Sequence, residues 1–254
     1  MDADSLLRNV GAAVTIFRLF SGVIMRKLAL ALFKDSGNIR DFVRKNIQLK
    51  DAASRRSAVK IAVIDDNPFK PQTNLANYGY KITPIGDIKS VSEVADYNIV
   101  LCDLMGVGLH FDQKNQGASI IAQIKQSYPS KIIIAYTGAA MGSQVARSAG
   151  DIADQIIRKD VDNDEWVATL DRQALDSVDP YVLWTKTRAR LVDLGAETKA
   201  ILILEDAYVR SVLSRDSGFH NLKNAMSEIN LAGDARSIVN GLISSIIFTV
   251  IFGT

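Results

Sequence analysis

Acidic, hydroxyl and basic side chains end four separate apolar runs of this sequence. Asp65 and Asp66 follow the first run, Asp103 ends the second, Thr137 the third and Lys159 the fourth. Carboxylates that converge repel one another unless a cation neutralises them, and hard oxygen ligands of this kind suit Mg²⁺. An aspartate beside such an ion can attack phosphorus, after which a hydroxyl and an ammonium group hold the phosphoryl oxygens. The set therefore predicts a phosphate-accepting aspartate site.

The runs that carry these residues are typical of a parallel sheet covered on both faces. Five short segments, most of them apolar or β-branched, are separated by polar or helical segments. In an open parallel sheet, chemistry gathers outside the carboxyl ends of the strands. A doubly wound α/β domain of about 115 residues would bring the candidate residues to one edge. The expected strands are residues 61–64, 81–84, 99–102, 132–136 and 155–158.

Helical patterns flank the sheet region on both sides. Apolar residues in the N-terminal arm recur at three- and four-residue intervals, which predicts an amphipathic helix. Asp179 and Pro180 predict the N-cap and first position of a long helix that reaches about Leu213. A further helix over 219–231 and an apolar terminal helix complete an all-α C-terminal region. The expected parts are a helical arm (1–57), an α/β domain (58–176) and an all-α region (177–254).

Composition narrows the class of protein. With 254 residues, 48% of them hydrophobic, the chain can bury a full core and carry extra elements. A net charge of +2, without a helix-turn-helix and basic recognition helix in residues 176–254, gives no reason to expect a nucleic-acid partner. The single cysteine, Cys102, excludes an internal disulfide, and no secretory leader is evident. We therefore expect a cytoplasmic protein.

One apolar segment has more than one interpretation. Residues Ser237 to Gly253 are interrupted only by Asn240 and small hydroxyl residues, and they fall just short of the roughly 20 residues of a membrane span. A helix buried among other helices is the favoured interpretation. A membrane anchor and a partner-binding face stay open as alternatives.

The order of the site residues resembles that of the receiver domain of two-component response regulators, over residues 58 to about 175. In that family a pair of acids follows the first strand, the phosphoacceptor aspartate the third, a Thr or Ser the fourth and a Lys the fifth. The interval of 22 residues between Thr137 and Lys159 is also similar. The resemblance implies a flavodoxin-like sheet of order 2-1-3-4-5 and a histidine kinase or histidine phosphotransfer protein as phosphate donor.

The resemblance also assigns roles to the candidate residues. Asp103 would be phosphorylated, Thr137 would report the phosphate and Lys159 would form an ion pair with it. The signal would pass to the flanking helices, which we expect to form a homodimer. The protein's only chemistry would be its own phosphorylation and dephosphorylation, rather than turnover of an external substrate. Three carboxylates and one backbone carbonyl would hold Mg²⁺, from Asp65, Asp66, Asp103 and Met105.

Two departures from the family pattern support a different function. Asp160 stands where family members usually have proline, and Ile156 replaces the aromatic residue of the last strand. The alternative is a degenerate receiver that serves as a structural platform and binds a partner or a membrane. A phosphatase of the haloacid dehalogenase type is disfavoured, because the first strand lacks the Asp-x-Asp that such an enzyme needs.

A second candidate phosphorylation site lies in the C-terminal region. The segment around His220 resembles the His-x-Leu-Lys segments of histidine kinase dimerisation helices and phosphotransfer modules. If it were phosphorylated, His220 would exchange phosphate with an aspartate, and Lys223 would offset its charge. Asn221 stands where the kinases usually place an acid, so an ordinary surface histidine is the favoured interpretation.

Overall fold

The computed structural model of the chain describes residues 51–244. All of them belong to the second of the two units into which the chain divides, Asn46–Thr254. The helix expected in the N-terminal arm lies outside the described residues. So do residues 245–254, which include most of the apolar C-terminal segment.

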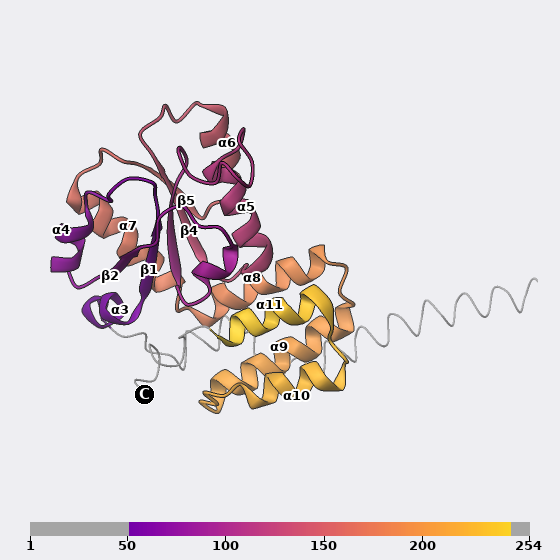
Figure 1. The fold of residues 1–254 in the computed structure, drawn as a ribbon. Helices are drawn as coiled ribbons and strands as arrows, with labels where there is room; N and C mark the ends of the chain where they lie inside the picture. Colours follow the sequence, from indigo (N-terminus) through magenta and orange to yellow (C-terminus); the bar gives the residue numbers. More distant parts are fainter. Residues whose placement is uncertain (1–50, 245–254) are drawn as a thin grey trace, which may run out of the picture. The chain divides into compact units, whose positions relative to one another are not determined.

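The α/β part is built on a five-stranded, all-parallel sheet of order β2-β1-β3-β4-β5 (Figure 1). This is the strand order of the flavodoxin-like doubly wound fold, so the expected fold class is confirmed for this part of the chain. The register aligns the carboxyl ends of the strands, with Asp103 opposite Tyr136 and Thr137 opposite Arg158. The strands are β1 (Lys60–Ile64), β2 (Lys81–Pro84), β3 (Ile99–Asp103), β4 (Ile132–Thr137) and β5 (Gln155–Arg158).

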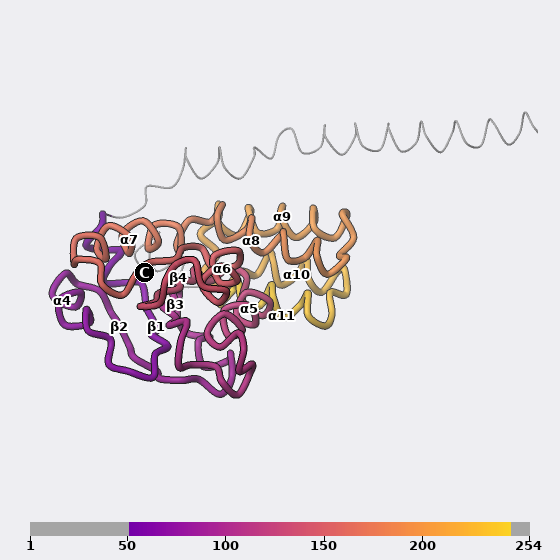
Figure 2. Tube along the Cα trace, turned by 90° about the horizontal axis from the view of Figure 1, so that it is seen from above, coloured from indigo at the N-terminus to yellow at the C-terminus, as the bar shows by residue number. Residues whose placement is uncertain are grey.

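Two apolar cores lie on opposite faces of the sheet, because successive strand residues point to alternate faces. Val63 belongs to a core that contains Trp166 of α7, whereas Cys102 belongs to one that contains Ile121 of α5. Figure 2 shows α4 and α7 on one side of the strands and α5 and α6 on the other. The covering helices are α3 (Ala52–Ala58), α4 (Gln72–Asn77), the 3₁₀ helix η1 (Val91–Val94), α5 (Gly117–Ser127), α6 (Gln144–Gly150) and α7 (Asn163–Asp176).

The C-terminal region is helical over its described residues, and α8 begins as the sequence predicts. Pro180 is its first residue, and the Asp179 carboxylate caps it by accepting from the Tyr181 N–H at 2.8 Å. The helices are α8 (Pro180–Asp193), α9 (Thr198–Leu213), α10 (His220–Glu228) and α11 (Gly233–Ile243). None of the helices in the described part of the chain has the length and apolar character needed to cross a membrane.

The prediction of one long helix from Pro180 to about Leu213 is wrong. Gly195 has a φ of +74°, in the left-handed region that glycine enters without steric cost. Its N–H donates to the Val192 carbonyl at 2.9 Å, and the Ala196 N–H donates to the Leu191 carbonyl at 3.0 Å. These two bonds form a Schellman motif, which ends α8 and separates it from α9.

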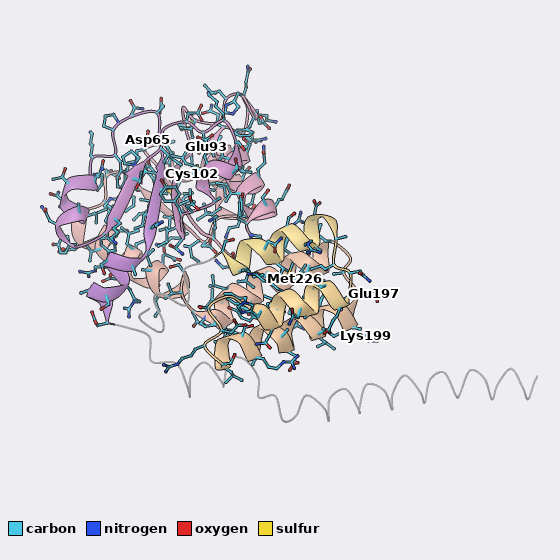
Figure 3. All side chains as sticks on the ribbon, turned by 60° about the horizontal axis from the view of Figure 1, so that its bottom comes forward. Asp65, Glu93, Cys102, Glu197, Lys199 and Met226 are labelled. Atoms are coloured by element: carbon cyan, nitrogen blue, oxygen red, sulfur yellow. The ribbon has the colours of Figure 1, made fainter. Side chains whose placement is uncertain are left out.

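Three aromatic rings form the centre of the C-terminal helices. Tyr208 lies between Trp184 and Phe219, stacked on them at centroid distances of 5.4 and 5.9 Å. The Trp184 indole N–H donates to the Glu205 carboxylate at 2.8 Å. Helix α11 contacts both α8 and α5. Figure 3 shows Glu197, Lys199 and Met226 in this helical part and Asp65 and Cys102 in the sheet-bearing part.

A carboxylate whose side chain is 17% exposed connects the sheet-bearing part to the C-terminal helices. Asp154, just before β5, accepts from Lys125 of α5, from Lys186 of α8 at 2.5 Å, and from the Ile133 N–H of β4 at 2.7 Å. Burial raises the pKa of Asp154, but the two ammonium groups outweigh this effect and hold it below its ordinary value. The Asp154 carboxylate therefore links α5, α8 and β4 through two ion pairs and one backbone hydrogen bond.

Candidate functional site

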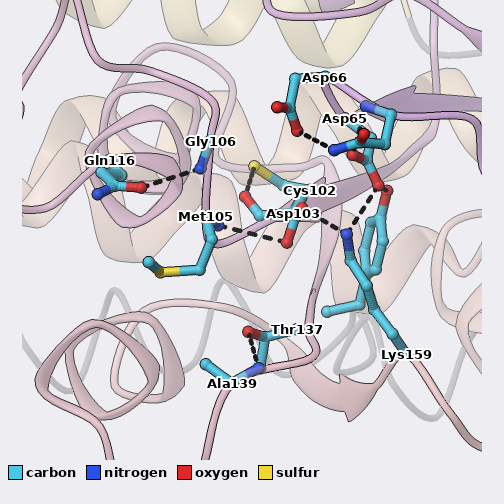
Figure 4. Close-up of polar contacts among 12 residues, drawn as sticks. Asp65, Asp66, Cys102, Asp103, Met105, Gly106, Gln116, Thr137, Ala139 and Lys159 are labelled. Atoms are coloured by element: carbon cyan, nitrogen blue, oxygen red, sulfur yellow. Dashed lines mark hydrogen bonds and ion pairs between the residues drawn. The ribbon is translucent and has the colours of Figure 1, made fainter.

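Asp65 is held in its ionised form at the end of β1. One carboxylate oxygen accepts from the Asn67 N–H at 2.8 Å. The other accepts from the Tyr136 hydroxyl at 2.8 Å and from the Lys159 ammonium at 3.1 Å (Figure 4). Burial raises the pKa of Asp65, but these three donors together hold it below its ordinary value. Asp65 therefore carries a fixed negative charge inside the site.

Asp103 is the last residue of β3, and its carboxylate is only 4% exposed. Its Oδ2 accepts from Lys159 Nζ at 2.5 Å, and its Oδ1 accepts from the Met105 N–H at 3.3 Å. Burial raises the pKa of Asp103; the Lys159 charge opposes this shift, and the Asp65 charge adds to it. Burial lowers the pKa of Lys159, but its two carboxylate partners outweigh this effect and raise it. Lys159 thus bridges both acids as an ammonium ion.

The structure brings the three predicted metal-ligand carboxylates together. Oxygens of Asp65, Asp66 and Asp103 lie within 4.8 Å of one another. Asp66 is exposed, and one of its oxygens accepts from the Asn67 side-chain amide at 2.8 Å. Carboxylates that converge in this way, one of them open to solvent, form a donor set that fits Mg²⁺. One Lys159 ammonium cannot neutralise all three.

A cavity of about 380 Å³ opens in front of this cluster. Asp66, Asp103 and Lys159 line it together with Met105, whose backbone carbonyl the family resemblance assigns to the metal. Gly106 lies against Asp66, since a Cβ atom placed on it would come within 2.7 Å of the carboxylate oxygens. Asp66 and Asp103 therefore border an open cavity, and the lack of a side chain at Gly106 leaves room for the Asp66 carboxylate.

Thr137 lies at the end of β4 and makes no hydrogen bond to the three acids in the described part of the chain. It is 1% exposed, and its hydroxyl oxygen accepts from the Ala139 N–H at 3.0 Å (Figure 4). The next two residues, Gly138 and Ala139, line the cavity in front of Asp103. Thr137 is thus within the same edge of the sheet, with its hydroxyl engaged in the turn that follows β4.

Two residues of the site, Tyr136 and Gln116, were not predicted from the sequence. Tyr136 reaches from β4 to Asp65, the residue after β1, across the intervening strand β3. Gln116 has a φ of +46°, which is rare for a residue with a side chain, and its amide oxygen accepts from the Gly106 N–H at 2.9 Å. This contact fixes the long loop between Asp103 and α5. The position of an aromatic residue at a strand end could have suggested Tyr136 as a site residue. Nothing in the sequence predicts the positive φ of Gln116.

The two departures from the family pattern lie outside the acidic cluster. The Asp160 carboxylate pairs with the Arg158 guanidinium at 2.6 and 2.7 Å, and both side chains are exposed. Ile156 packs partly buried against the core that contains Cys102. Neither residue touches Asp65 or Asp103 through an interaction in the described part of the chain.

His220 lies in the C-terminal helices, at the first position of α10. Its side chain is 79% exposed, and its Nδ1 is 2.7 Å from the Asp216 carboxylate. The structure therefore leaves the other ring nitrogen at the surface. It does not place His220 among the residues around Asp103.

No protein-family model matches the chain, and no curated protein matches it. The structure is similar to a CheY-like response regulator receiver domain protein from Methanospirillum hungatei JF-1, with 16% identity and a TM-score of 0.38 over 47% of this chain and 95% of that one. It is also similar to the signal receiver domain of an HD domain-containing protein from Pseudomonas fluorescens Pf-5, with 20% identity and a TM-score of 0.39 over 46% of this chain and 94% of the other.

A third similar structure is the BeF3-activated N-terminal receiver domain of RstA from Klebsiella pneumoniae. It shares 17% identity, with a TM-score of 0.38 over 45% of this chain and 97% of that domain. The central part of the chain is thus similar to receiver domains. At identities of 16–20%, this similarity concerns the fold.

Proposed function

We propose that the chain is a response-regulator-like signalling protein that accepts a phosphoryl group on Asp103. The observation that carries this proposal is the contact of one ammonium, Lys159, with two buried carboxylates, Asp65 at 3.1 Å and Asp103 at 2.5 Å. Asp65 is bound by three donors, whereas Asp103 faces the open cavity and has fewer. The two acids therefore differ in role, with Asp103 as the nucleophile.

The transfer would take place between an activated phosphate donor and Asp103, at the site that would also hold Mg²⁺. One Asp103 oxygen forms a bond to phosphorus while the bond from phosphorus to the donor breaks, and the donor keeps that electron pair. The donor leaves as acetate from acetyl phosphate, or as a histidine that regains a proton from solvent. Lys159 stays beside the new acyl phosphate and offsets its charge.

Asp65, Asp66, Asp103 and the Met105 carbonyl would hold Mg²⁺ in this reaction. When bound, the ion supplies charge neutralisation for the carboxylates and the phosphoryl oxygens. Without such neutralisation, an incoming phosphate would meet three acids and one ammonium. We therefore expect phosphorylation to depend on Mg²⁺.

The proposed donor is a histidine kinase or a histidine phosphotransfer protein, and the proposed output passes through the helices around the α/β domain. The ion pairs of Asp154 support this route, because they connect α5 with α8 through Lys125 and Lys186. Dimerisation through the helical extensions and a cytoplasmic location belong to the same proposal. Phosphorylation would shift the population of two arrangements rather than act on an external substrate.

The test is incubation of purified full-length protein with acetyl phosphate and Mg²⁺, followed by intact mass spectrometry. We expect one phosphoryl group per chain, stable in acid and removed by hydroxylamine. Asp103→Asn should abolish it, and chelation of Mg²⁺ should slow it strongly. The matched control is Asp160→Asn, which alters an exposed acid outside the cluster and should leave the modification intact. A chain that stays unmodified under saturating donor would refute the proposal.

A degenerate receiver that acts as a platform is the second candidate function. The observation in its favour is that Asp160 and Ile156 stand where family members usually have proline and an aromatic residue, and that Asp160 pairs with the exposed Arg158 while Ile156 packs against the core. Titration with Mg²⁺ separates the two functions. A metal-dependent rise in melting temperature that Asp66→Ala removes supports the phosphoacceptor, whereas no response supports the platform.

A further inference from the structure

The long loop between Asp103 and α5 contains one hydrogen bond that joins its two ends. Gln116, the last residue of the loop, accepts through its side-chain Oε1 from the Gly106 N–H at 2.9 Å (Figure 4). The phosphoryl transfer proposed above makes no use of Gln116. Its bond nevertheless acts on a peptide unit that belongs to the proposed metal site.

This peptide unit joins Met105 to Gly106. A trans peptide is planar, and residues 51–244 contain no cis peptide bond, so the Gly106 N–H and the Met105 carbonyl point in opposite directions. Because the N–H points to Gln116, the carbonyl points away from it. Rotation of the peptide unit would break the bond. The Gln116 side chain therefore sets the direction of the Met105 carbonyl.

The acidic cluster lies on the other side of this peptide unit. The Met105 N–H donates to the Asp103 carboxylate at 3.3 Å, and a Cβ atom built on Gly106 would lie 2.7 Å from both Asp66 carboxylate oxygens. Figure 4 shows Met105 and Gly106 with Gln116 on one side and Asp66 and Asp103 on the other. The carbonyl is thus turned to the side of the acids, where a hard cation takes oxygen ligands.

Gln116 makes this bond from an unusual backbone conformation. Its φ is +46° and its ψ is −125°, a combination that glycine adopts freely and that residues with a side chain rarely adopt. Its N–H donates to the Asp112 carbonyl at 2.8 Å, and its carbonyl accepts from the Ser119 N–H at 2.9 Å, so the surrounding backbone holds this conformation. Strained backbone of this kind is enriched at functional sites. A glycine would fit here with less strain, but it could not bind the Gly106 N–H.

From this bond, this peptide geometry and this strained backbone we infer that Gln116 is a positioning residue, whose side chain orients the Met105 carbonyl toward a Mg²⁺ ion at the acidic cluster. The inference rests on the proposed function, because it concerns the proposed Mg²⁺ site. Partners that orient a metal ligand typically contribute a factor of about 10–100 to metal affinity. We expect about 10-fold for Gln116, because only one of the ligands depends on it.

The test observes this peptide unit directly, in full-length protein labelled with ¹³C at the methionine carbonyls and with ¹⁵N at the glycines. The sequence contains two Met–Gly pairs, at Met105 and at Met141. A spectrum selected for bonded ¹³C and ¹⁵N therefore contains two signals, and Met141→Leu assigns them by removing one. We expect Mg²⁺ to shift the signal of the Met105 carbonyl and the Gly106 amide saturably. The titration gives the dissociation constant for Mg²⁺ without a phosphodonor.

Gln116→Gly removes the side chain and relieves the backbone strain. Its dissociation constant for Mg²⁺ should rise about 10-fold, and its Gly106 amide signal should move before Mg²⁺ is added. Its melting temperature without Mg²⁺ should stay within about 4 °C of the wild-type value, because the relief of strain offsets the lost bond. A role in folding alone would instead lower the melting temperature and leave the affinity for Mg²⁺ unchanged. Gln116→Glu, which keeps an acceptor oxygen at the same reach, should bind Mg²⁺ at least as tightly as the wild type.

Asn115→Ala is the matched control, because the neighbouring Asn115 amide donates to the Asp112 carboxylate at 2.7 Å, within the same loop. It should leave the affinity for Mg²⁺ unchanged. If the wild type responds to Mg²⁺ and Gln116→Gly binds it as tightly, or if Asn115→Ala weakens binding equally, the inference is overturned and the proposed function stands. If the wild type itself shows no response to Mg²⁺, the proposed metal site fails and the inference fails with it.

Discussion

Gly117, the first residue of α5, lies in backbone contact with the end of β3. A Cβ atom built on it would lie 1.9 Å from the Asp103 carbonyl oxygen and 2.9 Å from the Leu104 Cα. These atoms belong to the main chain, so no side-chain rotation relieves the clash. To reach even 3.0 Å, α5 would have to move by about 1.1 Å relative to β3. Gly117→Ala therefore tests whether α5 fixes the position of Asp103.

We expect Gly117→Ala to lower the free energy of unfolding by about 1–3 kcal/mol, the usual range for overpacking. For a chain of this length that corresponds to a fall in melting temperature of roughly 2–12 °C. A displacement of about 1 Å at the nucleophile can slow a reaction about 100-fold. Phosphorylation by acetyl phosphate should therefore slow by more than the loss of folded protein explains. Urea denaturation and a time course of intact mass measure the two effects.

Gly150→Ala is the matched control. Gly150 ends α6, and a Cβ atom built there meets nothing within 4 Å. The substitution should be neutral or stabilise the protein by about 0.4–1 kcal/mol, because it restricts the unfolded chain. If Gly117→Ala were as stable and as reactive as Gly150→Ala, the close packing of α5 on Asp103 would be refuted.

Two further predictions concern the charges that support the fold. Arg56 holds the pKa of Asp171 below its ordinary value of 3.8. The ion pair therefore stabilises the folded state fully above pH 3.8, and this contribution is lost as the pH falls through the lower pKa of Asp171 in the folded protein. Asp171→Asn should therefore cost about 1–2 kcal/mol at pH 7 and less at pH 3, measured by urea denaturation; an equal loss at both pH values would contradict this reasoning. Asp154→Ala should lower the free energy of unfolding by about 3–5 kcal/mol at pH 7, because it leaves the Lys125 ammonium without its carboxylate partner. Burial already lowers the pKa of Lys125 to about 8, so deprotonation should shrink this cost as the pH rises from 7 to 9; a loss that grows over this range would argue against a buried ammonium at Asp154.

The sequence predicts the sheet well because its signals are local. The apolar runs end at Asp65, Asp103, Thr137 and Lys159, and parallel strands bring their carboxyl ends to one edge. The strand positions therefore follow from the local pattern of apolar runs, whereas the strand order was implied by the family resemblance. The clustering of the acids then follows from the fold.

Contacts between residues far apart in the chain could not be predicted from the sequence. The bond from Tyr136 to Asp65 crosses an intervening strand, so no spacing in the chain announces it. Gly195 lies within a helical pattern, and only its left-handed conformation, fixed by two C-terminal hydrogen bonds, shows that a helix ends there. The positive φ of Gln116 and the bond of its side chain to the Gly106 N–H likewise depend on the fold of the loop, not on a local sequence pattern.

We expect Asp103, and no other residue, to take the phosphoryl group. Full-length protein is treated with acetyl phosphate and Mg²⁺ and reduced with borohydride, which converts a phosphoaspartate to homoserine, and its peptides are then sequenced by mass spectrometry. We expect homoserine at position 103 alone, with Asp65 and Asp66 unmodified. Homoserine at Asp65 or Asp66, an acid-labile phosphate on His220, or no modified residue at all would contradict it.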